Sequence, residues 1–168
     1  ISYNNDGTVE SKQTFQGKND DSSWARGQAW AIYGYTACFR ETNDSIFLNF
    51  AKDIADMIMD RVKTEDAIPY WDYDAPVTKE TPRDVSAASV TASAMIELST
   101  MVPDGQKYLD YAEKILKSLS SDAYLAKVGD NQGFILLHSV GSLPNGSEID
   151  TPLNYADYYY LEGLKRFM

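Results

Sequence analysis

Two kinds of helix alternate along this chain of 168 residues, and their alternation constrains the fold more than any other feature. The predicted helices 22–41, 84–101 and 154–167 carry small or polar residues on more than one face. The predicted helices 44–63 and 106–120, which lie between them, are plainly amphipathic. Small residues allow close packing on several sides and suit an inner ring, whereas amphipathic helices suit an outer ring with one wet face. The order predicts an α/α toroid or a helical repeat array.

The predicted helices make only about two and a half inner and outer pairs, so a closed toroid would need further helices. The chain also begins at Ile1 without an initiator Met, a basic start or a cleavage site. We therefore expect residues 1–168 to be part of a longer barrel. The segment 129–152 is predicted to be a loop, apart from a short apolar run at 134–137 that could form a strand.

Acidic residues precede the inner helices. Asp21 or Ser22 is predicted to cap the first, and Asp84 and Asp150 are predicted to cap the later two in the same way. Arg83 and Asp84 could form a local ion pair.

The composition excludes several classes of function. The net charge of −10 argues against nucleic-acid binding, which needs a cationic face, and no run approaches the length of a membrane helix. Cys38, the single cysteine, lies in an apolar helical context and is predicted to be a buried, inert thiol. With His138 the single histidine, a metal site is not expected. An anionic small ligand is still compatible with the charge, provided that a local cation such as Arg26 or Arg83 holds it.

The most informative motif is the run Asp20-Asp21-Ser22-Ser23-Trp24-Ala25-Arg26-Gly27-Gln28-Ala29-Trp30. Arg26 and Trp30 are four residues apart, so both lie on one face of the predicted helix. A guanidinium can clamp a carboxylate with two hydrogen bonds, and an indole can lie against an apolar ring face. A uronic acid sugar offers both groups.

Each of these residues also has a structural interpretation. Arg26 could be a surface ion-pair residue, and Trp30 could belong to the core. Asp20 and Asp21 could pass for a glycosidase carboxylate pair, but helix capping is the favoured interpretation. The cluster 70–73 either lines a sugar site or wedges its loop onto the barrel.

The chain resembles glycoside hydrolase family 88, the unsaturated glucuronyl hydrolases, along nearly its whole length. The first block is specific, and Gln28-Ala29-Trp30 favours the glucuronyl branch over the related unsaturated rhamnogalacturonyl hydrolases. The order of the later blocks supports the resemblance. The blocks that carry it are 14–17, 20–30, Tyr33-Gly34, 69–72, 83–88, 138–141, 147–153 and 155–159.

The resemblance implies an all-α (α/α)6 barrel, of which residues 1–168 would form about half, as the C-terminal part of a single catalytic domain. It implies an enzyme without a cofactor that releases a 4,5-unsaturated uronic acid from lyase-generated oligosaccharides by hydration of the enol ether. The catalytic aspartates of the family lie in its N-terminal half, and no position here corresponds to them. Arg26 would bind the uronate carboxylate, Trp30 would stack on the sugar ring, and Gln16 would hydrogen-bond near the reacting group. Thr14 and Ser147 would line the pocket.

Two other functions stay open at this stage. The rhamnogalacturonan branch is one, and a non-catalytic helical-repeat binding module is the other. Half a barrel would leave inner helix faces uncovered, so the chain alone is expected to form a homo-oligomer through that surface and to lack activity. Localisation in the cytoplasm and in the periplasm both fit the resemblance.

Overall fold

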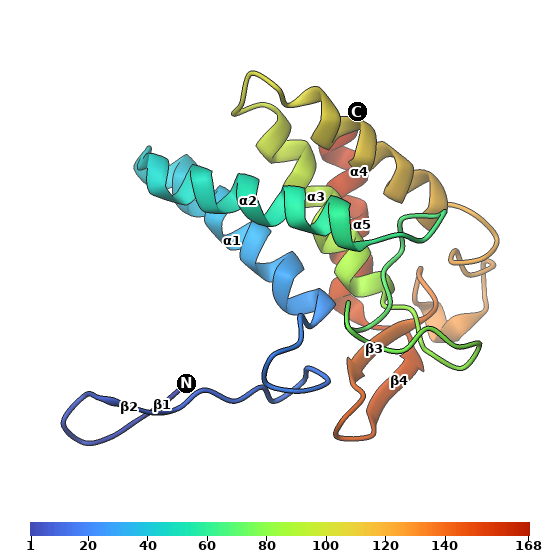
Figure 1. The fold of residues 1–168 in the computed structure, drawn as a ribbon. Coiled ribbons are helices and arrows are strands. Elements are labelled where there is room, and N and C mark those ends of the chain that lie inside the picture. The colour runs from blue at the N-terminus through green and yellow to red at the C-terminus, as the bar shows by residue number, and fades with distance from the viewer.

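The computed structural model describes residues 1–168 and contains five α-helices with short strands in the segments between them (Figure 1). The helices are α1 (Ala25–Thr42), α2 (Ser45–Arg61), α3 (Val85–Ser99), α4 (Gln106–Leu119) and α5 (Asn154–Phe167). The strands form two antiparallel pairs, β1 (Ser2–Tyr3) with β2 (Val9–Ser11) and β3 (Ser139–Ser142) with β4 (Ser147–Thr151). A short 3-10 turn, η1, covers Asn131–Gly133. None of the helices is long and apolar enough to cross a membrane.

The helices form an inner row and an outer row, as the alternation along the sequence predicts. Helix α3 contacts α1, α4 and α5, while α2 lies outside α1 and α4 outside α3 (Figure 1). The inner row is therefore α1, α3 and α5, with α3 in the middle. This is the arrangement of about half of an (α/α)6 barrel, so the predicted fold class is confirmed.

The small residues of α3 allow it to be covered on every side. All but two of its 15 residues are buried, including serines and threonines that would otherwise face water. Gly163 lets α5 approach closely, because a Cβ atom there would lie 3.3 Å from Leu116 Cδ2. Helix α4, by contrast, buries a single apolar stripe of Tyr108, Ala112, Ile115, Leu116 and Leu119.

The three long segments that precede the inner helices lie at the same end of the molecule (Figure 1). Single bridges tie them together. Trp24 pairs with Asp72, and the Val85 amide donates to the carbonyl of His138 at 3.1 Å. The bridge between Tyr70 and Arg83 closes the segment between α2 and α3 on itself. This end, where the inner helices begin, is the end that carries the residues of the predicted site.

The first helix begins three residues later than the sequence predicts, and neither Asp21 nor Ser22 caps it. Trp24 occupies the N-cap position without a side-chain hydrogen bond. The Ala25 amide instead donates to the carbonyl of Trp71 at 3.1 Å, and Ser22 Oγ donates to Asp72 at 2.7 Å. The neighbouring loop thus supplies the hydrogen-bond acceptor that a local cap would have provided for the beginning of α1.

The possible strand at 134–137 is reduced to an isolated antiparallel bridge between Leu136 and Leu125, and the longer strands are β3 and β4, within the predicted loop. The amides of Ile135 and Leu136 donate to the carboxylate of Asp157 on α5, at 2.8 and 2.9 Å. The apolar run is therefore held both by α5 and by residues 124–126. The Ala126 amide donates to the Ile135 carbonyl at 2.8 Å, and the Leu137 amide donates to the Tyr124 carbonyl at 2.9 Å. Serine and glycine in β3 gave no alternating pattern by which that strand could have been found.

Several single-residue predictions are settled by the structure. Asp84 caps α3 as predicted, by accepting hydrogen bonds from the amides of Ser86 and Ala87. Asp150 does not cap α5, because its carboxylate is bound to His138 Nδ1 at 2.6 Å. Cys38 is exposed rather than buried.

Arg83 pairs with Asp66 and not with its neighbour in sequence. Its Nη2 donates to both carboxylate oxygens, at 2.9 and 2.8 Å, and Tyr124 donates to the same carboxylate at 2.6 Å. Burial raises the pKa of Asp66, but the hydrogen bonds from Tyr124 and the Ile68 amide, together with Arg83, outweigh it and leave that pKa below its ordinary value of 3.8. This cluster fastens the segment between α2 and α3.

We predict that Asp66→Asn lowers the free energy of unfolding of the full-length protein by about 2 kcal/mol at pH 7, measured by urea denaturation. Because the pKa of Asp66 is lower in the folded protein, the ionised side chain stabilises the fold above pH 3.8. This stabilisation is lost as the pH falls through the folded-state pKa. The difference between the two proteins should therefore shrink in acid. The exposed Asp60→Asn is the control, and an equal loss in both variants would contradict the prediction.

Candidate functional site

Arg26 projects from the first turn of α1 into a buried network that joins three segments. It is 3 % exposed. Its Nη1 lies 3.3 Å from Asp84 Oδ2 and 3.3 Å from Ser86 Oγ, and it also donates to the Val140 carbonyl. Its Nη2 donates to the carbonyl of Gly141. The guanidinium thus holds the beginning of α1, the beginning of α3 and strand β3 in one place.

Two aromatic rings lie against this guanidinium. Its Cζ atom lies 4.7 Å from the ring centroid of Trp24 and 5.5 Å from that of Tyr155 on α5. Such stacking is favourable when the cation is removed from water. A guanidinium has five N–H donors, and Nε–H of Arg26 has no acceptor within the protein. Arg26 is therefore buried below the surface, but its Nε–H can still donate a hydrogen bond to a ligand.

Asp84 is the anionic partner in the network and is fully buried. Its Oδ1 accepts from Ser86 Oγ at 2.6 Å, from the Ser86 amide at 3.1 Å and from the Val140 amide at 3.4 Å. Burial raises the pKa of Asp84, whereas Arg26 and these donors lower it. The Arg26 guanidinium, which keeps its proton, lies 3.3 Å from Asp84. We therefore assign Asp84 as an ionised carboxylate.

Gln16 reaches the same backbone carbonyl as Arg26. Its Nε2 donates to the Gly141 oxygen at 2.8 Å, so two residues of the predicted site converge on one atom. Gly141 has no room for a side chain, because a Cβ atom there would lie 2.6 Å from the Cβ atom of Glu148 on β4. The glycine allows Glu148 to lie against strand β3 within the hairpin.

Trp30 lies one turn further along α1, against two tyrosines of α5. Its ring centroid is 6.1 Å from that of Tyr155 and 5.2 Å from that of Tyr159, which it meets edge to face. Tyr33 meets Tyr159 in the same manner at 5.0 Å. These half-buried rings form an aromatic wall between the two inner helices, next to the guanidinium.

The structure does not bring Thr14 and Ser147 into this network. Thr14 Oγ1 accepts from the Gly17 amide at 2.9 Å and its own amide donates to Asp20 at 2.8 Å, so it shapes the turn that carries Gln16. Ser147 is exposed at the beginning of β4, opposite Ser142. Their proposed role in lining a pocket rests on the resemblance alone.

Sequence reasoning missed two participants. The sequence predicts Asp84 as a helix cap and as a possible local partner of Arg83, and it assigns Tyr155 no role in the site. A signal for Tyr155 was present, since it precedes Tyr159 by four residues at the beginning of an inner helix, as Arg26 precedes Trp30 in the first. Burial raises the pKa of the Tyr155 hydroxyl, although Arg26 opposes the shift.

Fold and site together define a class of protein. Half of an α/α barrel, with a cation and an aromatic wall where the inner helices begin, is an arrangement suited to binding an acidic sugar. The model described as glycosyl hydrolase family 47 matches residues 27–136. The chain belongs to the glycosyl hydrolases.

The names of the curated relatives are more specific than this family name. The chain is 47% identical over 161 residues to an unsaturated glucuronyl hydrolase of Formosa agariphila, covering 95% of this chain and 40% of that protein. It is 34% identical over 157 residues to the enzyme of the same name from Bacillus sp. strain GL1, covering 91% of this chain and 41% of that protein. The chain therefore spans about two fifths of the length of the curated relatives it matches.

Solved structures agree with these relatives. One described as an unsaturated glucuronyl hydrolase specific for heparin is 57% identical, with a TM-score of 0.96 over 99% of this chain and 46% of that chain. Another, an unsaturated glucuronyl hydrolase mutant from Streptococcus agalactiae complexed with dGlcA-GalNAc6S, is 32% identical with a TM-score of 0.86 over 99% of this chain and 45% of that chain.

The matching family model is not that of family 88, which the motifs resemble. The match to family 47 covers α1 to α4 but excludes Gln16, Arg26 and the β3–β4 hairpin. It thus reflects the paired helices, whereas the relatives match over the site as well.

We predict that Asp84→Asn lowers the free energy of unfolding of the full-length protein by about 3–5 kcal/mol, because it leaves the buried charge of Arg26 without a partner. Asparagine caps helices about as well as aspartate, so the loss would report the ion pair and not the cap. Asp44→Asn, at the N-cap of α2, is the matched control and should change stability by less than about 0.5 kcal/mol. Similar losses in the two variants, measured by urea denaturation, would disprove the assignment.

Proposed function

We propose that the protein containing this chain is an unsaturated glucuronyl hydrolase of the family 88 type. The observation that supports the proposal most is the convergence of Arg26 and Gln16 on the Gly141 carbonyl, beside the aromatic wall that contains Trp30. A cation, an amide and a ring face are what a uronate with a planar unsaturated ring requires. The relatives that share this region over nearly the whole chain carry that name.

In this proposal residues 1–168 are the C-terminal part of one barrel-shaped catalytic domain and hold the substrate. Arg26 binds the uronate carboxylate through donors that the protein leaves unused, and Trp30 lies against the ring. Gln16 hydrogen-bonds near the reacting carbon, and Thr14 and Ser147 line the approach.

The reaction is hydration of an enol ether. A carboxylic acid protonates the vinyl carbon, water adds to the neighbouring carbon, and the hemiketal that forms opens to release the sugar. The buried, stacked guanidinium holds the sugar ring in position while positive charge develops on that ring. No residue of this chain is assigned as the acid, so catalytic aspartates are expected elsewhere in the full-length protein.

The proposed substrates are disaccharides that polysaccharide lyases release from glycosaminoglycans. A neighbouring structure is described as specific for heparin and another contains a sulfated unsaturated disaccharide, so both kinds of substrate need to be compared. We propose no preference for sulfate, because Phe15, next to Gln16, and Ile149, two residues after Ser147, supply no positive charge.

We predict that the full-length protein consumes heparin-, chondroitin- or hyaluronan-derived unsaturated disaccharides, followed as loss of absorbance of the unsaturated uronate. Arg26→Ala should lower kcat/KM by at least about 100-fold, because the carboxylate loses a charge-assisted partner. Gln16→Ala, which removes no buried charge, should lower it by about tenfold without unfolding the protein.

Arg40→Ala, at the other end of α1, is the control for Arg26→Ala and should retain activity. If the Gln16→Ala protein is active with unchanged kcat/KM, Gln16 has no role in binding the substrate. A full-length protein inactive on every unsaturated uronate would refute the proposed function.

We also propose that the 168-residue chain, in isolation, associates with itself. Its exposed large hydrophobic residues include Ile46 and Phe50 on α2 and Tyr158, Leu161 and Phe167 on α5. Helix α5 forms one open edge of the half barrel, and α2 packs on the outside of α1, which forms the other edge. We predict a dimer or larger species in light scattering of the purified chain, and Phe50→Lys should lower its molar mass. A monodisperse monomer would disprove self-association.

A further inference from the structure

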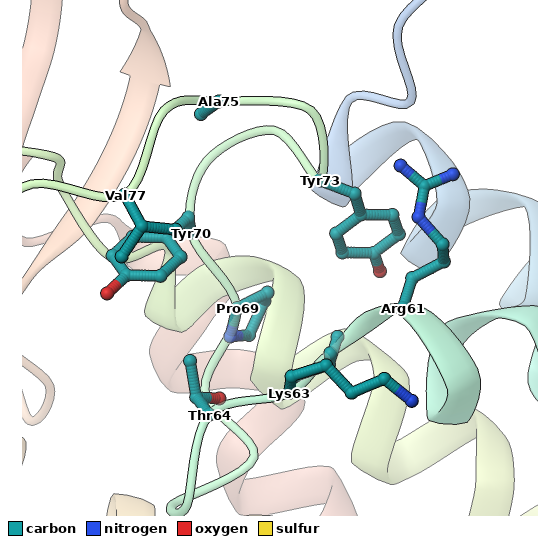
Figure 2. A pocket seen from close by; sticks show the side chains of 9 residues that line it. Arg61, Lys63, Thr64, Pro69, Tyr70, Tyr73, Ala75 and Val77 are labelled. Atoms are coloured by element: carbon teal, nitrogen blue, oxygen red, sulfur yellow. The ribbon is translucent and has the colours of Figure 1, made fainter.

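A pocket of about 380 Å³ lies beside the segment that joins α2 to α3, apart from the candidate site (Figure 2). Arg61 and Lys63 come from the end of α2, and Tyr70 and Tyr73 lie on opposite sides with Pro69 between them. The volume falls within the range of small-molecule sites. None of the residues that line this pocket contributes to the Arg26 network.

The lining combines positive charge with ring faces. Two of its nine residues are cationic, none is acidic, and Tyr70, Tyr73, Pro69 and Val77 supply apolar surface. In a chain with a net charge of −10, such a lining is unusual and marks the pocket as a place for an anion. Tyrosine rings favour flat or cyclic ligands, so a negatively charged sugar fits both features.

The charge of Lys63 is available to a ligand. Its side chain is 73% exposed, and its ion pair with Asp60, at 3.2 Å, is exposed as well. Exposed pairs of this kind contribute little and exchange readily. Arg61 is more constrained, since it is bound to Asp74 at 2.7 Å and lies over the ring of Tyr73.

The walls of the pocket are already in position. Arg83 lies 4.8 Å from the ring centroid of Tyr70 and is bound to Asp66 by two hydrogen bonds. On the other wall, the Tyr73 amide donates to the carbonyl of Ser23 at 2.9 Å. A ligand would therefore bind without the cost of ordering a loop.

The pocket continues into a second hollow that shares Tyr70 and Val77 with it. That hollow is lined further by Thr78, Lys79, Thr81 and Arg83. Lys79 forms no ion pair in the structure. Lys63 lines the first hollow and Lys79 the second, and we call the two together the Lys63–Lys79 groove.

We propose that the Lys63–Lys79 groove binds an acidic oligosaccharide as a second site, separate from the Arg26 and Trp30 site. The ligand class rests on the proposed function, under which the protein works on fragments of acidic polysaccharides. The groove would hold a longer anionic chain on the protein, whereas a disaccharide would engage the candidate site alone.

The test measures binding of a saturated hyaluronan hexasaccharide to the full-length protein by titration calorimetry. This ligand carries uronates but no unsaturated ring, so its binding does not depend on the proposed reaction. The double variant Lys63→Glu/Val77→Asp should weaken binding by about tenfold or more, because it reverses one charge and adds another in the groove. Turnover of an unsaturated disaccharide should stay within about twofold of the unaltered protein.

The matched control is Lys117→Glu/Val128→Asp, which makes the same chemical changes at exposed residues outside the groove. Lys117 is likewise 73% exposed and paired with a nearby acid, and Val128 is fully exposed. Retained binding in the control with loss in the groove variant supports the second site. Equal affinity of the two double variants, absence of hexasaccharide binding, or equal binding of neutral maltohexaose overturns it. If no unsaturated uronate is consumed, the proposed function fails, and hexasaccharide binding still decides the second site.

Discussion

The buried ion pair between Arg26 and Asp84 is the interaction on which the rest of this structure depends. Placing two charges in an apolar interior costs several kcal/mol unless each finds close partners. Asp84 satisfies that condition by also capping α3, and Arg26 by also binding the carbonyls of Val140 and Gly141. Helix α1, helix α3 and the β3–β4 hairpin therefore assemble together, because omitting any one leaves a buried charge or a buried carbonyl without its partner.

The same guanidinium connects the fold with the proposed function. Arg26 is held by the backbone of one hairpin and lies against two aromatic rings, so its side chain is fixed by several contacts at once. A site built this way is rigid before a ligand arrives, which lowers the cost of binding. The Lys63–Lys79 groove differs from this site, since Lys63 is exposed while Arg83 and Asp66 fix the wall behind it.

Much of the fold could be predicted because its signals are local. Helical periodicity located all five helices, and the contrast between small-residue and amphipathic helices separated the inner row from the outer one. Asp84 was recognised as a cap from its position alone. The beginning of α1 and the β3–β4 hairpin could not be found in this way, because backbone groups of distant segments, such as the carbonyl of Trp71, decide where they form.

The sequence by itself determined the helical architecture and singled out Arg26, Trp30 and Gln16. Only the tertiary structure decided what these side chains do. It paired Arg26 with Asp84, 58 residues away, and with the carbonyl of Gly141, 115 residues away, and it left Cys38 exposed on the outside of its helix. The physical reason is that periodicity reports which face of a helix is apolar, whereas the partner of a charged side chain is chosen among all the groups that the packed chain brings within a few ångströms.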